Sequence, residues 1–68
     1  MNRAAVDYND IEDSKVFAIT KHCDQPPVFG EDILTYDDDG NTCLGRVIFY
    51  LDPRVIIKLD INTWKAGE

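Results

Sequence analysis

The stretch RVIFYLDPRVIIKLDI, residues 46–61, decides the fold, because two apolar runs flank an Asp-Pro pair. In the second run, residues 55–61, apolar side chains stand at every second position, which is the pattern of a strand with one buried face. Val47, Phe49 and Leu51 alternate in the same way in the first run. Both runs are rich in the β-branched and aromatic residues that suit a sheet. We therefore predict two antiparallel strands joined as a hairpin.

The register of this hairpin follows from keeping its apolar residues on one face. A loop over residues 52–54 achieves this, through the pairs Leu51–Val55, Phe49–Ile57 and Val47–Leu59. A slip by one residue would turn the apolar set to the other face, so we predict the three-residue loop. The same register sets Arg46 opposite Asp60, a favourable cross-strand pair.

A second hairpin is predicted around TYDDDGNT, residues 35–42. The pair Asp39-Gly40 favours a tight turn, because glycine accepts a positive φ and aspartate tolerates one. Strand-like sequences, DILTY and TCLGRVIFY, flank the turn. A two-residue turn gives the pairs Tyr36–Cys43 and Leu34–Gly45, with Leu34, Tyr36 and Cys43 on the core face. A longer turn with a glycine bulge would shift this register and stays open.

The remaining segments complete a small, mainly β fold. We predict a further strand over residues 15–21, KVFAITK. It is partly apolar on both faces, which suits a central or covered position. Residues 22–32 contain two prolines and a glycine and should form a loop. We predict one domain over residues 1–68, with a four-stranded antiparallel sheet of meander-like hairpins over residues 15–62.

The two ends of the chain lie outside this predicted sheet. Residues 1–14 should form an extended arm or a short helix, and a helix would make the class α+β. Residues 65–68 should be a frayed tail. On the outer face of the sheet, Ile48, Tyr50 and Ile56 form an apolar surface that needs a cover, from the N-terminal segment, a second copy or a partner.

Charge is the most informative bulk property of the chain. The net charge is −6, and residues 1–39 hold ten acidic side chains against three basic ones. Such a field repels nucleic acid and anionic lipid and attracts basic partners. We therefore expect neither direct nucleic-acid binding nor membrane binding. No signal-like apolar stretch opens the sequence, so we expect a cytoplasmic protein with free thiols at Cys23 and Cys43.

No motif in the sequence points to catalysis or to a metal. If Gly40 took position six of an EF-hand loop, Thr35 and Arg46 would stand where that loop needs acidic ligands. The run His22-Cys23-Asp24 holds the only histidine, and neighbours in sequence seldom form a catalytic constellation. The basic residues of the second half alternate with acidic ones, which argues against a nucleic-acid platform. We predict no enzyme activity, metal or cofactor.

The leading functional hypothesis is a small acidic inhibitor that occupies a basic, nucleic-acid-binding surface of a larger protein or nucleoprotein complex. Phages and mobile elements encode proteins of this kind against host machinery. The predicted contact residues are seven carboxylates at the turn and in the N-terminal segment: Asp37, Asp38, Asp39, Asp7, Asp10, Glu12 and Asp13. The alternative is a structural or assembly protein, a homodimer or small subunit, that works through the apolar face of Ile48, Tyr50 and Ile56.

Overall fold

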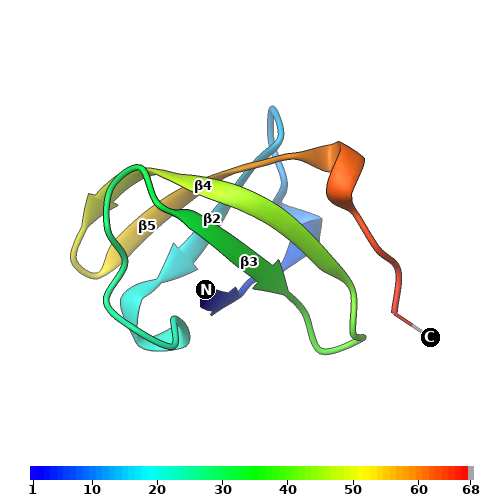
Figure 1. Ribbon diagram of the computed structural model, residues 1–68, viewed down its shortest axis with the longest axis horizontal. Helices are drawn as coiled ribbons and strands as arrows, with labels where there is room; N and C mark the ends of the chain where they lie inside the picture. Colours follow the sequence, from blue (N-terminus) through cyan, green and yellow to red (C-terminus); the bar gives the residue numbers. More distant parts are fainter. Residues whose placement is uncertain (68) are drawn as a thin grey trace.

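The computed structural model describes residues 1–67 and shows five strands that form one curled sheet, a half-barrel (Figure 1). The strands are β1 (Asn2–Ala5), β2 (Lys15–Ile19), β3 (Asp32–Tyr36), β4 (Thr42–Leu51) and β5 (Arg54–Leu59). Three short 3₁₀ turns connect or follow them: η1 (Tyr8–Asp10), η2 (Thr20–His22) and η3 (Ile61–Thr63). The strand order is β1-β3-β4-β5-β2, in which β1 runs parallel to β3 and the other pairs are antiparallel.

The mainly β class is confirmed, but the prediction of four antiparallel strands is wrong. The segment expected to be an arm or a short helix supplies a fifth strand, β1, and then η1. β1 escapes the sequence pattern because it has four residues and buries Asn2 together with Ala4. The buried Asn2 amide is satisfied by donating to the Gln25 carbonyl and accepting from the Gln25 N–H, each at 3.0 Å.

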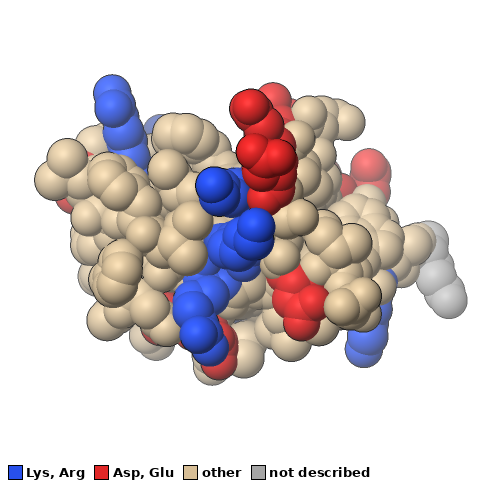
Figure 2. All heavy atoms as spheres, turned by 90° about the horizontal axis from the view of Figure 1, so that it is seen from above, with Lys and Arg blue, Asp and Glu red and all other residues tan. Residues whose placement is uncertain are grey.

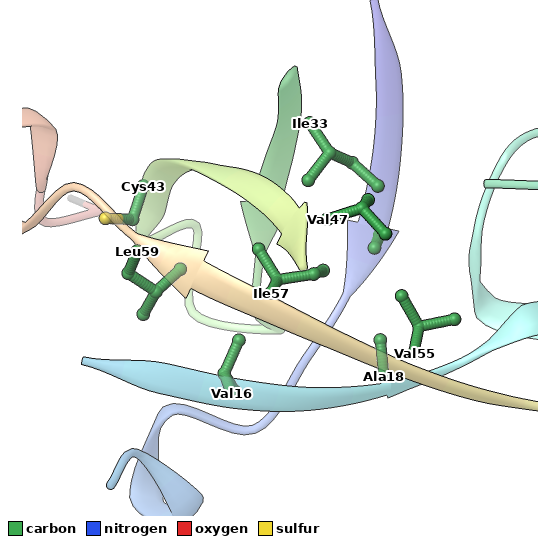
Figure 3. Close-up of a cluster of buried hydrophobic side chains, with 9 residues drawn as sticks. Val16, Ala18, Ile33, Cys43, Val47, Val55, Ile57 and Leu59 are labelled. Atoms are coloured by element: carbon green, nitrogen blue, oxygen red, sulfur yellow. The ribbon is translucent and has the colours of Figure 1, made fainter. Parts of the chain in front are cut away.

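The core lies inside the curl of the sheet, where side chains from every strand meet (Figure 3). The central strands supply the largest buried side chains, and β2 adds Val16 and Ala18. The buried set is Ala4, Val16, Ala18, Ile33, Cys43, Val47, Val55, Ile57 and Leu59. The prediction of a central or covered position for β2 is wrong: β2 forms one edge of the sheet, with Phe17 exposed, and β1 forms the other edge.

The β3–β4 hairpin has a five-residue loop over residues 37–41, so the two-residue turn is wrong and the structure has a longer turn, as in the alternative left open. Thr35 therefore pairs with Cys43, and Ile33 pairs with Gly45. Because the register differs by one residue from the two-residue turn, Ile33 and Thr35 face the core in place of Leu34 and Tyr36. The loop is longer because the Asp37 carboxylate binds the backbone inside it, and Gly40 adopts a φ of 82° there.

The β4–β5 hairpin is tighter than predicted, with Leu51 opposite Arg54 and a cis Asp52–Pro53 peptide in the turn. Further along, a β-bulge between Val47 and Phe49 shifts the register. The extra residue breaks the alternation, so Phe49 and Leu51 turn outward and Tyr50 packs against the core. The register change also pairs Arg46 with Lys58 instead of Asp60.

The C-terminal tail is held against the sheet where it was expected to fray. Lys65 and Thr42 exchange two backbone hydrogen bonds of 2.8 and 2.9 Å, and the Gly67 N–H donates to the Asn41 side chain at 2.7 Å. Figure 1 shows this segment beside the β3–β4 loop. Glu68, the last residue of the predicted tail, lies outside the described residues.

The turn into β2 offers a simple test of the backbone geometry. Asp13 and Ser14 adopt φ values of 52° and 61°, between Glu12 and Lys15, which bond to each other through their backbones. Glycine accepts this left-handed conformation better than serine does. We expect Ser14→Gly to raise the free energy of unfolding by about 0.5–1 kcal/mol in urea denaturation. Ser14→Ala, the control, should give no gain, and a destabilising Ser14→Gly would contradict the left-handed turn.

Gly45 tests the close packing at the centre of the sheet. It lies between Ile33 and Leu59, and a Cβ there would stand 2.5 Å from Ile57 Cγ2 and 2.8 Å from the Lys58 carbonyl oxygen. Ile57 is fully buried and the Lys58 oxygen belongs to the backbone of β5, so the strands must shift to admit a methyl group. We expect Gly45→Ala to lower the free energy of unfolding by about 1–3 kcal/mol. An unchanged denaturation midpoint would contradict this packing.

Candidate functional site

An open groove of about 940 Å³ runs between the two edges of the curled sheet. One wall comes from the end of β1 and from η1, and the other wall is β2, through Phe17, Ala18 and Ile19. The β3–β4 loop, which precedes β4, and the β4–β5 turn, which follows it, also line the groove. The groove exists because the sheet curls without pairing β1 to β2.

Carboxylates dominate the charge of this groove. Five of the seven predicted contact residues line it: Asp7, Asp10, Asp37, Asp38 and Asp39. The lining also includes Arg54 and His22, for which no binding role was predicted. The groove therefore carries a net negative charge and suits a cationic surface.

Glu12 and Asp13, the other two predicted contact residues, do not line this groove. They lie in the tight turn before β2 and line a smaller neighbouring hollow of about 250 Å³, to which Asp10 and Phe17 of the groove also contribute. The structure thus places five of the predicted carboxylates in the groove and two outside its lining, with Asp10 shared between the groove and the hollow.

Hydrogen bonds within the chain fix the positions of two groove carboxylates. Asp7 caps η1 by accepting from the Asn9 N–H at 2.9 Å. Asp37 Oδ1 accepts from the N–H groups of Asn41 and Asp39 at 2.9 and 3.1 Å, and its Oδ2 accepts from Asn41 Nδ2 at 2.8 Å. The Val6 N–H donates to the Tyr36 carbonyl at 2.9 Å, which brings the end of β1 to this loop. Two segments distant in sequence thereby contribute to one acidic surface.

The Asp37 carboxyl is held in its ionised form. Desolvation opposes ionisation, but the hydrogen bonds from Asn41 and Asp39 outweigh it and place the pKa of Asp37 below its ordinary value. Asp37 is therefore part of the loop structure. In contrast, the side chains of Asp10, Asp38 and Asp39 make no hydrogen bond to other groups within residues 1–67, which leaves them available to a partner.

The outer face of the sheet, opposite the core, differs from its predicted composition. Ile48 is exposed and Ile56 is half-buried, as an outer surface requires, but Tyr50 belongs to the core side. Phe17 and Phe49 flank Ile56 in register and are 58% and 40% exposed. Because of the bulge in β4, Phe49 lies on this outer face in place of Tyr50.

A basic row crosses this outer face, where basic residues were predicted to alternate with acidic ones and not to cluster. Lys15, Lys58 and Arg46 are cross-strand neighbours on β2, β5 and β4. Figure 2 shows Lys and Arg side chains in a column with acidic side chains at both ends. Arg46 forms an ion pair with Asp32 at 3.2 Å, and Lys58 Nζ donates to the Asp13 carbonyl at 3.1 Å. Part of this positive charge is thus engaged within the chain.

In the run His22-Cys23-Asp24, the last two residues bond to partners outside the run. The Cys23 thiol donates to the Ile19 carbonyl at 3.7 Å, and Asp24 pairs with Arg3 at 2.8 Å. Burial, with the nearby Glu31 and Asp24, raises the pKa of Cys23, which disfavours the thiolate. Within residues 1–67, no three His, Cys, Asp or Glu side chains are arranged to hold a metal ion. No helix in this range has the length and apolar character needed to cross a membrane.

Sequence reasoning missed the contribution of β2 to the groove. Phe17 and Ile19 were recognised as one face of a strand, but no local pattern shows that a strand lies at a sheet edge. That position depends on the pairing of β1 with β3, which leaves β2 beside β5 alone.

Comparison of the chain with protein-family models, with curated proteins and with solved structures found no match. Function is therefore inferred from the groove and the sheet themselves.

The role of Asp37 in the loop predicts a stability effect that depends on pH. Since its folded-state pKa is lowered, its contribution is complete above its ordinary pKa of 3.8 and is lost as pH falls through the lower folded value. We expect Asp37→Ala to be less stable than wild type at pH 7 in urea denaturation, and this difference to shrink below about pH 4.

Asp38→Ala is the matched control for Asp37→Ala, because it removes the same charge from the same loop without removing a hydrogen bond. It should leave the denaturation midpoint at pH 7 near that of wild type. Equal effects of the two substitutions would show that charge, and not the hydrogen-bonded loop, is what Asp37 contributes.

Proposed function

We propose that this protein is a non-enzymatic binding protein whose acidic groove occupies a basic surface of a larger protein or nucleoprotein complex. Among basic surfaces, one that normally binds nucleic acid matches the negative charge of the groove best. By blocking such a surface, the protein would act as an inhibitor. Inhibitors of this kind are encoded by phages and mobile elements against host machinery.

The observation that supports the proposal is the convergence of five carboxylates on one open groove. They come from η1, its cap and the β3–β4 loop, which are separated by more than twenty residues of sequence. Asp10, Asp38 and Asp39 are not engaged by other side chains of residues 1–67. Like charges held close together disfavour each other in the free protein, and a cationic partner relieves this repulsion.

A charge-matched pair of variants tests the groove. Asp38→Asn/Asp39→Asn removes two groove charges and keeps Gly40, while Glu12→Gln/Asp13→Asn removes two charges from the neighbouring turn. The partner is recovered with the tagged chain from the cells that make it, identified by mass spectrometry and purified. Calorimetry should then show about three- to tenfold weaker binding for the groove variant, because each partly screened charge contributes modestly.

The control variant should bind as wild type does, and wild-type affinity should fall steeply as salt is raised. Equal weakening by both variants would mean that net charge, and not the groove, attracts the partner. Binding that survives both the groove substitution and high salt would contradict the proposal.

A second candidate function is assembly through the outer face, as a homodimer or a small subunit of a complex. Phe17, Ile56 and Phe49 form a cross-strand row there, and two of the three are substantially exposed. Apolar association changes little with salt, so sedimentation at low and high ionic strength separates it from capture by the groove. Phe49→Ser should dissolve such an assembly and leave binding by the groove unchanged.

A further inference from the structure

The backbone of β2 has an open edge that faces the groove. In an antiparallel pair, successive residues direct their N–H and C=O groups alternately toward and away from the partner strand. The bonds Leu59 N–H to Ser14 C=O and Thr20 N–H to Pro53 C=O flank the β2–β5 ladder and show that even-numbered residues face β5. Phe17 and Ile19 therefore direct their backbone groups away from the sheet.

Within residues 1–67, three of these outward groups have no hydrogen-bond partner: the Phe17 N–H, the Phe17 C=O and the Ile19 N–H. The flanking groups are occupied, because Lys15 bonds with Glu12 and the Ile19 carbonyl accepts from the Cys23 thiol. The open edge is thus confined to the centre of β2, where Phe17, Ala18 and Ile19 form one wall of the groove.

The opposite edge of the sheet is covered by the chain itself. The Arg3 carbonyl of β1 accepts from the Asp24 N–H at 2.8 Å, and Asn2 holds Gln25 through two further bonds. Sheet edges are normally covered, bulged or interrupted by proline, because an open edge pairs with other chains. The centre of β2, Val16–Ile19, has none of these devices.

The surroundings of the open edge define what can pair with it. Phe17 and Ile19 are 58% and 38% exposed on the outer face, so an added strand can pack apolar side chains beside them. Across the groove stand Asp7 and Asp10, and the β3–β4 loop adds its aspartates. A strand that fits both surroundings alternates two kinds of residue. Its apolar residues lie beside Phe17 and Ile19, and its lysine or arginine residues face the groove carboxylates.

From this geometry we propose that β2 captures an extended basic segment of the partner protein, which adds a strand to the sheet along Phe17–Ile19. The inference rests on the proposed function and specifies its mode of recognition. Main-chain hydrogen bonds to Phe17 and Ile19 hold the segment, and the groove carboxylates select its positive charge. A second copy of this chain is disfavoured as the occupant, because two chains of charge −6 would bring their acidic grooves together.

Synthetic peptides test this inference on the full chain. The probe is a peptide of about nine residues that alternates lysine and valine, long enough to span β2. A second peptide carries methyl groups on its central backbone amides, so it keeps the charge and side chains but cannot donate to a strand edge. On the protein, Phe17→Pro removes the outward N–H, which edge strands tolerate, and Phe17→Ala is the control that keeps it.

The unmodified peptide should slow hydrogen exchange of the Phe17 and Ile19 amides about tenfold and leave the Val16 and Ala18 amides, already bonded to β5, unchanged. Methylation of the peptide and Phe17→Pro should each weaken binding about tenfold, as expected from losing one or two hydrogen bonds. The methylated peptide needs no change to the protein, so this comparison holds even where Phe17→Pro fails to fold. Phe17→Ala should weaken binding less than Phe17→Pro does.

The outcomes separate this inference from the proposed function. If both peptides bind equally and the exchange of Phe17 and Ile19 is unchanged, while Asp38→Asn/Asp39→Asn weakens binding, the edge inference is overturned and the acidic groove stands. If the unmodified peptide protects the edge but the aspartate substitutions have no effect, strand addition stands and the charge-based function fails. If the Phe17 and Ile19 amides become more protected from hydrogen exchange as protein concentration rises without peptide, a second copy of the chain occupies the edge. That result would overturn the inference.

Discussion

The hydrogen bonds that Asp37 accepts inside the β3–β4 loop determine much of the structure around them. They hold a five-residue loop, which sets Thr35 opposite Cys43 and turns Ile33 and Thr35 into the core. The buried Thr35 hydroxyl then bonds with the Cys43 carbonyl at 2.7 Å and with the Tyr8 hydroxyl at 2.9 Å. Tyr8 also packs edge-on against Trp64, at 4.8 Å between ring centroids. The loop thereby helps to position η1, and with it the carboxylates of Asp7 and Asp10.

The strands of the sheet were predictable where a long apolar pattern marks them. β2 to β5 were all recognised, because each carries β-branched or aromatic residues and is bounded by turn residues. The registers of the two hairpins were not predictable, because they depend on features that the alternation of apolar and polar residues does not reveal. One is the side-chain capping by Asp37, and the other is the extra residue of the β4 bulge, which exchanges Tyr50 with Phe49 between the two faces. β1 was missed because a four-residue strand that buries an asparagine carries no alternating signal.

The candidate site was predictable in its charge and unpredictable in its shape. The sequence places most carboxylates in the first 39 residues, and five of the seven predicted ones line the groove. Their convergence depends on the parallel pairing of β1 with β3, which carries Asp7 to the β3–β4 loop. Glu12 and Asp13 are only a few residues further along the chain, but a left-handed turn directs them elsewhere. Nearness in sequence therefore did not distinguish the groove carboxylates from the others.

The open edge of β2 and the small size of the protein have a common physical origin. A chain of this length buries only roughly 60% of the surface of its unfolded form, so its sheet encloses a thin core. Closing a barrel would remove both edges, but here the curl ends with β1 covered by Cys23–Asp24 and with β2 open. A strand added along β2 would satisfy the open backbone groups and cover part of Phe17 and Ile19, whose exposure is a cost in the free protein. The same incomplete closure that leaves β2 without a second neighbour thus leaves unpaired the main-chain groups to which the proposed partner segment would bond.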